Sequence, residues 1–133
     1  MIAPVMEQNA AGRHVYLPED MLMIRFRSPE DYDLIPLPKG DHWISFSLRE
    51  FPLFVKKDHP VLLCPGGECS ESLDDRTFTA LCMTDREVSY ELYRDNGTDP
   101  DPVLEEHLTT ALIPASALRS SPVPGVAISS LVL

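Results

Sequence analysis

One stretch in the middle of the chain, from His42 to Cys64, constrains the fold most, because its apolar residues recur at every second position. Ile44, Phe46 and Leu48 are spaced two apart, which places their side chains on one face of a β-strand. The alternation resumes a few residues later, and a further apolar run follows an Asp-His-Pro turn. The stretch is therefore predicted to form sheet core. Long helices are not expected, since the chain contains 13 prolines against 6 glycines.

Shorter runs of the same kind predict strands on both sides of this stretch. These strands are expected at 1–5, 14–17, 22–26, 77–83 and 88–92. In the run 22–26, one face is expected to be apolar and the other partly basic. The runs 77–83 and 88–92 are separated by four residues and therefore predict a β-hairpin. The part of the chain between 114 and 133 has no clear period, so irregular structure is expected there, with a last strand at 126–133 as the alternative.

The segment 102–112 is compatible with two structures. Pro102 can occupy the first position of a helix, and the apolar residues that follow have helical spacing. The β-branched residues in 109–113 instead favour a strand. The helix is the favoured interpretation, with the strand as its alternative.

A change in composition predicts where the chain divides. Residues 65–75 are rich in Gly, Ser and acidic residues, which is typical of a long loop or linker. We therefore expect one domain at 1–64 and a second at 76–133. A length of 133 residues allows one ordinary domain or two small ones that share an interface.

The charge balance limits the possible partners. The formal net charge is -10, from 21 acidic and 11 basic residues, so nucleic acid and anionic membrane surfaces would repel the chain. No apolar run approaches the roughly 20 residues that a membrane-spanning helix requires, so no membrane segment is expected. An acidic inhibitor or immunity-type protein stays open as an alternative, although the carboxylates are scattered along the sequence.

The cysteines indicate a reducing compartment and no metal. Cys64, Cys69 and Cys82 cannot all pair within one chain, and the N-terminus lacks the layout of a signal peptide, so a cytoplasmic location is expected. The gap between Cys64 and Cys69 is wider than in a zinc knuckle, and no second close pair exists. The Gly66-Gly67 pair is not followed by the Lys and Ser/Thr of a phosphate-binding loop. No metal ion or cofactor is therefore expected.

No catalytic residues are predicted. Adjacent carboxylates, such as Glu19-Asp20, point to opposite faces of a strand and do not converge on one substrate. No serine lies in a Gly-x-Ser-x-Gly elbow. Trp43 and Tyr93 are candidates for stacking against a sugar ring, while the alternative is that these aromatic side chains belong to the core.

Three segments resemble glycoside hydrolase family 31, the α-glucosidases and α-xylosidases. The first contains Ala-Pro-Val at 3–5 and Arg-His-Val-Tyr-Leu-Pro at 13–18, which is similar to the two strands that follow the catalytic barrel in that family. The second, Phe-Pro-Leu-Phe-Val-Lys at 51–56 with the apolar run 61–64, is similar to the Ile-Pro-Leu-Phe-Val-Arg strand and its successor. The third, at 92–97, resembles the Leu-Tyr-x-Asp-Asp-Gly element of the distal C-terminal domain.

The order and spacing of these segments agree with the family over about residues 1–113, with some departures. Lys56-Lys57-Asp58 stands where the family has Arg, a small residue and Gly, and residues 21–23 replace a usual aromatic. Trp43 is followed by Ile-Ser-Phe, so the nucleophile motif of the family is absent and no catalytic residue transfers to this sequence.

The resemblance implies a mainly β chain of two small antiparallel β-sandwich modules. Residues 1–64 would form the proximal C-terminal domain and residues 76–133 an incomplete distal one, both from a truncated or split gene. Their role would be to support a barrel that this chain lacks, so the chain alone is expected to be inactive. The expected partners are the barrel of the parent glycosidase or a second copy of the chain, together with an oligosaccharide. A free-standing carbohydrate-binding β-sandwich stays open as an alternative.

Overall fold

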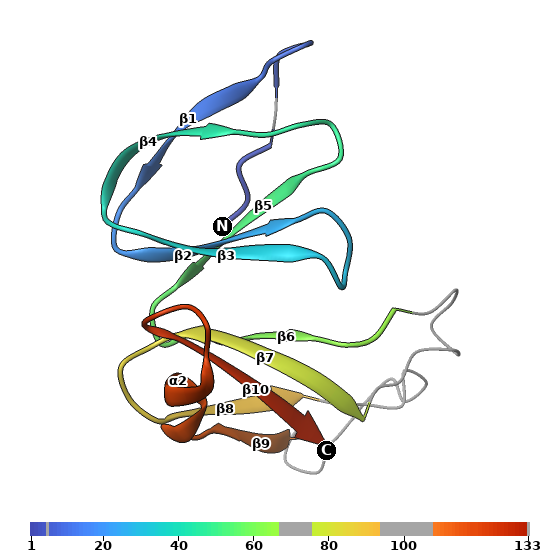
Figure 1. Ribbon diagram of the computed structural model, residues 1–133, viewed down its shortest axis with the longest axis vertical. Coiled ribbons are helices and arrows are strands. Elements are labelled where there is room, and N and C mark those ends of the chain that lie inside the picture. The colour runs from blue at the N-terminus through green and yellow to red at the C-terminus, as the bar shows by residue number, and fades with distance from the viewer. Residues whose placement is uncertain (5, 67–75, 94–107, 133) are drawn as a thin grey trace.

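The computed structural model describes residues 1–4, 6–66, 76–93 and 108–132, which form four antiparallel sheets stacked in layers (Figure 1). The first sheet pairs β1 (Gly12–Leu17) with β4 (Gly40–Ser45), and the second has the order β3 (Tyr32–Leu37), β2 (Met21–Phe26), β5 (Phe51–Lys56). The third has the order β10 (Val126–Val132), β7 (Thr77–Met83), β6 (Val61–Leu63), and the fourth pairs β8 (Val88–Tyr93) with β9 (Leu108–Ile113). One short helix, α2 (Ser116–Ser120), lies beside β10. The prediction of a mainly β, antiparallel chain is confirmed.

The second sheet is covered on both faces, which explains the sequence of β2. Met21 and Met23 of this strand are buried in a core against the first sheet, while Leu22 and Ile24 are buried in a core against the third. A strand buried on both sides reads as a continuous apolar run rather than an alternation. Leu22 and Ile24 thus lie on one face and Met23 and Arg25 on the other, as expected, and Met23 is buried as well.

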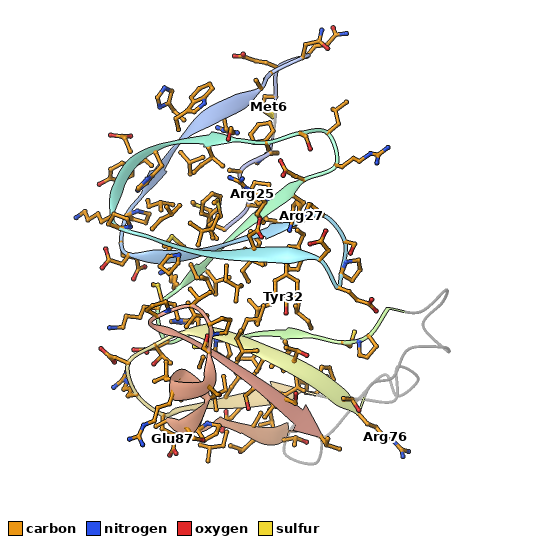
Figure 2. All side chains as sticks on the ribbon, viewed as in Figure 1. Met6, Arg25, Arg27, Tyr32, Arg76 and Glu87 are labelled. Carbon is orange, nitrogen blue, oxygen red and sulfur yellow. The ribbon has the colours of Figure 1, made fainter. Side chains whose placement is uncertain are left out.

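The middle core connects the two halves of the chain. Leu22, Ile24 and Val55 of the second sheet pack there with Leu81 and other residues of the third. Figure 2 shows the side chains that fill the space between these two layers. The predicted division at 65–75 stays a prediction, and the described residues on its two sides share this core.

A third core lies between the third and fourth sheets. Small side chains dominate on the third sheet, where Ala80, Cys82 and Ala127 are fully buried. Because small side chains let two layers approach closely, Ala117 of α2 and Ile113 of β9 pack directly against them. The helix α2 was not predicted, since its segment reads as irregular; it is a single short element that buries only Ala117.

Two predictions about the second half are wrong. The runs 77–83 and 88–92 do not form a hairpin: β7 pairs with β10 and β6, whereas β8 pairs with β9. The turn between them carries the chain from the third sheet to the fourth. The favoured helix is also wrong at 108–112, where β9 alternates a buried Ala111 with an exposed Leu112; residues 102–107 lie outside the described residues. The alternative strand at 109–113 and the last strand are confirmed within the described range.

The beginning of the chain lies along the edge of β5 without forming a full strand. The amino group of Met1 donates a hydrogen bond to the carbonyl of Phe54 at 2.6 Å, and the Phe54 amide donates to the Met1 carbonyl at 2.8 Å. Ile2 forms a single bridge with Leu53, so the strand expected at 1–5 is reduced to this contact, and residue 5 lies outside the described residues. The strand expected to reach Leu48 ends at Ser45.

Candidate functional site

The outer face of the first sheet carries an aromatic platform. Trp43 of β4 lies directly opposite His14 of β1 in the strand register. Their rings meet edge to face, with 4.9 Å between centroids and 66° between planes. The indole is nevertheless 58% exposed, as is Tyr16 further along β1 at 57%. These three residues form an open aromatic strip, which we call the Trp43 strip.

Gly12 determines how the indole is seated. A Cβ atom at this position would come within 3.0 Å of Trp43 Cε2 and 2.6 Å of the Ile44 carbonyl oxygen. No side chain larger than hydrogen fits there without moving the backbone of β4. The indole therefore packs close to the β1 backbone at Gly12, which fixes one part of the ring and leaves most of its surface open.

A cleft of about 300 Å³ lies beside the indole. It is lined by Met6, Glu7, Ala10, Gly12, Arg13, His14 and Trp43. The guanidinium of Arg13 is held by the backbone, since Nη1 donates to the Pro4 carbonyl and Nε donates to the His14 carbonyl at 3.5 Å. The cleft thus combines an apolar ring with one carboxylate and one oriented guanidinium. That combination suits an uncharged ligand with many hydroxyl groups.

Tyr93, the second predicted stacking residue, lies far from this site. It ends β8 in the fourth sheet and is 39% exposed. Trp43 lies in the first sheet, with three cores between the two layers. The structure therefore does not bring the two predicted residues together, and of the two only Trp43 lines a cleft described here.

The described cysteines occupy different environments. Cys64 is half-buried just after β6, and Cys82 is fully buried in the third core. Burial raises the pKa of the Cys82 thiol to about 11, and the negative charge of Asp58 adds to this effect, so Cys82 is a protonated thiol at neutral pH. Cys69 lies outside the described residues. Within the described ranges, no three His, Cys, Asp or Glu side chains are grouped as a metal site requires.

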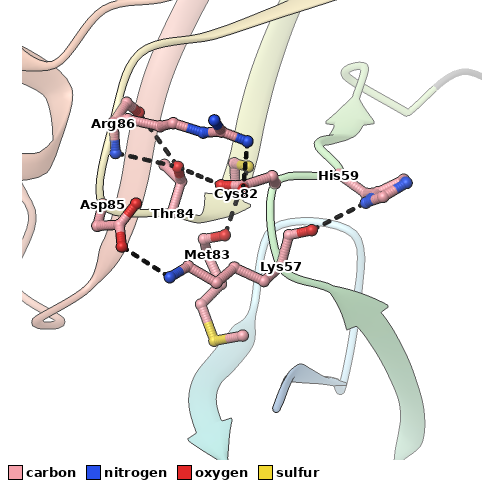
Figure 3. Close-up of polar contacts among 8 residues, drawn as sticks. Lys57, His59, Cys82, Met83, Thr84, Asp85 and Arg86 are labelled. Atoms are coloured by element: carbon pink, nitrogen blue, oxygen red, sulfur yellow. Dashed lines mark hydrogen bonds and ion pairs between the residues drawn. The ribbon is translucent and has the colours of Figure 1, made fainter. Parts of the chain in front are cut away.

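A polar network connects the turn after β5 with the turn after β7 (Figure 3). The buried Thr84 hydroxyl donates to Asp58 Oδ1 at 2.6 Å, and the other oxygen of that carboxylate accepts from Arg86 Nη2 at 3.0 Å. Beside them, Lys57 Nζ donates to Asp85 Oδ2 at 2.7 Å. We call these five residues the turn clamp. Sequence reasoning missed it, because its members are about 26 residues apart and form no motif.

The backbone strengthens the turn clamp. Asp58 has a left-handed conformation, with φ of 61°, which aspartate tolerates better than most residues. Its amide donates to the Met83 carbonyl at 2.9 Å, so the two turns are joined by backbone as well as side-chain hydrogen bonds. The clamp therefore fixes the second sheet to the third at one edge of the middle core.

Thr84→Val is expected to lower the free energy of unfolding by about 1–3 kcal/mol, because the valine has the same shape but leaves Asp58 and the Arg86 amide without their buried partner. Thr84 is only 2% exposed, so the valine methyl group stays buried where the hydroxyl was. Denaturant unfolding measures the difference. Thr84→Ser retains the hydroxyl and is the matched control; equal destabilisation by both substitutions would show that the methyl group, not the hydrogen bond, matters.

Stability is expected to fall in acid because of the same clamp. The hydrogen bond from Thr84, followed by the charge of Arg86, lowers the pKa of Asp58, and the hydrogen bond from Lys57 lowers the pKa of Asp85. Both folded-state pKa values lie below the ordinary value of about 3.9. The stabilisation is therefore fully present above that value and is lost as the pH falls through the lowered pKa values.

The measurement is the free energy of unfolding as a function of pH. We expect a decline that begins between about pH 5 and pH 4 and continues below it. Arg27 also lowers the pKa values of Asp31 and Asp33, so wild type alone does not isolate the clamp. The free energy of unfolding of Asp58→Asn should decrease less steeply with falling pH than that of the wild type. Parallel curves for the two proteins would contradict the assignment to Asp58.

A scan against protein-family models finds no match, and a search of curated proteins finds no chain that matches this one in sequence. Among the described residues, none of the helices has the length and apolar character needed to cross a membrane.

Proposed function

We propose that this chain is the non-catalytic C-terminal β region of a family 31 glycoside hydrolase of the α-glucosidase type, and that it supports a catalytic barrel. The observation that carries the proposal is where the family-like segments lie. Residues 13–18 correspond to β1 and the turn after it, residues 51–56 are β5, and residues 61–63 are β6. These parts of the family-like sequence therefore coincide with framework strands, whereas residues 94–97 of the third segment lie outside the described residues.

The buried residues within those strands support a structural role. Val15 and Leu17 of β1 pack with Phe54 of β5 in the first core, and Val55 of β5 belongs to the middle core. The family-like residues thus build the sheets and the contacts between them. In the complete enzyme, two carboxylates about 5 Å apart would perform retaining hydrolysis of α-glucosidic bonds, and both would come from the barrel. The proposed location is the cytoplasm.

Exposed apolar side chains support a partner that covers part of the first half. Away from the Trp43 strip and its cleft, the large apolar side chains there that are exposed are Met1, Ile2, Leu48 and Phe51. Several hundred Å² of exposed apolar surface is common where another domain or protein binds. The proposed partner is the barrel, and self-association of the chain is the alternative occupant.

The acidic inhibitor stays a second prediction with less support. Several carboxylates in the described residues are paired with cations rather than collected on one negative face. The pairs are Arg27 with Asp31 and Asp33, Lys56 with Glu19, Lys57 with Asp85, and Arg86 with Asp58. An inhibitor of a basic protein depends on an unpaired acidic surface.

Co-elution with a barrel tests the proposal. A family 31 α-glucosidase truncated after its barrel is mixed with this chain and separated by size exclusion with light scattering. We expect a one-to-one complex and loss of any self-association of the chain. A chain that stays monomeric and separate from the barrel, with a sharp melting transition of its own, would contradict the proposal and favour a free-standing binding protein.

A further inference from the structure

We infer that the cleft beside Trp43 is a non-catalytic binding site for a neutral oligosaccharide, with one sugar ring stacked on the indole. The choice of α-linked glucose as the sugar rests on the proposed function; the stacking site itself rests on the geometry of the first sheet. Such a site would hold a polysaccharide chain against the protein and would cleave no bond.

The indole has the properties of a preorganised stacking surface. His14 contacts it edge to face and Gly12 lies against it, so the ring is held by two neighbours while it remains 58% exposed. Side-chain entropy that is already lost before binding does not oppose binding. The C–H groups on one face of a pyranose are apolar and carry a slight positive charge, which complements the negative face of an aromatic ring.

The polar groups of the cleft can form hydrogen bonds with the hydroxyl groups at the edge of a sugar ring. Glu7 and Arg13 line the cleft together with Trp43. A carboxylate accepts hydrogen bonds from hydroxyl groups, and a guanidinium has five N–H donors, of which the contacts of Arg13 with Pro4 and His14 use two. One acceptor and one donor of opposite charge favour an uncharged polyol over an anionic ligand.

The length of the Trp43 strip favours more than one sugar unit. Tyr16 is two residues beyond His14 on the same face of β1, which is about 7 Å along the strand. A single pyranose stacked on Trp43 does not cover both aromatic rings. The cleft of about 300 Å³ lies beside Trp43, and Tyr16 is not part of its lining, so a ligand that reaches Tyr16 extends beyond the cleft. We therefore expect a bound oligosaccharide to contact Trp43 with one unit and Tyr16 with a neighbouring one.

Trp43 is the only tryptophan in the chain, so its fluorescence reports on this site directly. The full chain is titrated with maltotetraose. The indole is excited selectively, and its emission is recorded at each concentration. We expect a saturable change with a Kd of roughly 1 mM or below. Glucose should bind at least several-fold more weakly, because it reaches only one ring of the strip. The absence of a saturable change up to roughly 10 mM maltotetraose would overturn the inference.

Calorimetric titration extends the test to variants without the indole. Trp43→Ala should weaken maltotetraose binding roughly ten-fold or more, and Trp43→Phe, which retains a smaller ring, should weaken it less. Tyr93→Ala removes an exposed aromatic from the fourth sheet and should bind as wild type does. Binding that survives in Trp43→Ala, or that is lost in Tyr93→Ala, would place the site elsewhere and overturn the inference. Melting curves verify that each variant is folded.

This experiment is separable from the test of the proposed function. Failure of maltotetraose to bind leaves the barrel complex to be judged by co-elution alone. If maltotetraose binds but no complex with the barrel forms, the result would support the sugar-binding site and contradict the assignment to a glycosidase. Equal affinity for maltotetraose and for cellotetraose would contradict the choice of α-linked glucose but would keep the stacking site.

Discussion

Leu81→Ala is expected to lower the free energy of unfolding by about 2–5 kcal/mol and to destabilise both halves of the chain together. Leu81 is fully buried on β7 and packs in the middle core with Leu22, Ile24 and Val55 of the second sheet. Removal of its side chain leaves a cavity between the second sheet, whose strands precede residue 65, and β7, which follows residue 75. For a small protein, this loss is a large fraction of the total stability.

Trp43 fluorescence and far-ultraviolet dichroism measure this effect in parallel during denaturant unfolding. Trp43 lies in the first sheet, so its signal reports on a layer that Leu81 does not touch. A shift of both transitions by the same amount is expected. Leu112→Ala, at an exposed position of β9, is the matched control and should change stability by at most about 0.5 kcal/mol. An unchanged Trp43 transition in Leu81→Ala would mean that the halves unfold independently.

Phe54→Ala is expected to cost about 3–5 kcal/mol, the largest effect of any single truncation considered for this chain. Its ring is 1% exposed and is the largest fully buried side chain in the described residues. It packs in the first core together with Met23 of β2 and Ile44 of β4. The neighbouring Val55 points into the middle core, so loss of Phe54 should weaken the first core selectively.

Phe51→Ala on the same strand is the control for Phe54→Ala. Phe51 is exposed and contacts only the ring of Phe26 among the aromatic pairs described here, so its truncation should cost much less. Thermal or denaturant unfolding compares the two variants. Equal losses would contradict the assignment of Phe54 to a closed core. A loosened first sheet in Phe54→Ala should also alter the Trp43 emission before global unfolding.

Period and turn residues predicted several of the strands but not β3, and they did not predict how the strands pair. The alternation in 77–83 and 88–92 predicts two strands correctly, and a four-residue turn between them suggests a hairpin. In the structure, the chain instead passes to another sheet at this turn. Both faces of β7 are covered by other layers, because Leu81 is buried on one face and Cys82 on the other. A local pattern does not contain this long-range requirement.

The helix expected at 102–112 is a second case in which a local pattern did not predict the structure. Pro102 and the apolar spacing favour a helix, but Ala111 and Ile113 are both buried while Leu112 is exposed. Two-residue spacing of buried side chains in β9 therefore overrides helix propensity at 108–112. Conversely, α2 contains only five residues, too few for a periodic signal.

The candidate site was predicted only in part. Trp43 was named from the sequence as a candidate for sugar stacking, which stays a prediction, and its neighbours in the site were not foreseen. His14 and Gly12 lie next to Trp43 because β1 pairs with β4, although the β2–β3 hairpin separates these two strands in the sequence. No local motif predicts this pairing. The turn clamp was missed for the same reason, since Asp58 and Thr84 meet only through the stacking of two sheets.

A chimaeric enzyme tests the central claim most directly. In a family 31 α-glucosidase, this chain replaces the region that follows the barrel, and hydrolysis of 4-nitrophenyl α-glucoside is compared with that of the barrel alone and of this chain alone. The account predicts that the barrel alone is poorly active, that the chimaera regains hydrolysis, and that the isolated chain has none. A chimaera no more active than the barrel alone, or hydrolysis by the isolated chain, would contradict a supporting, non-catalytic role.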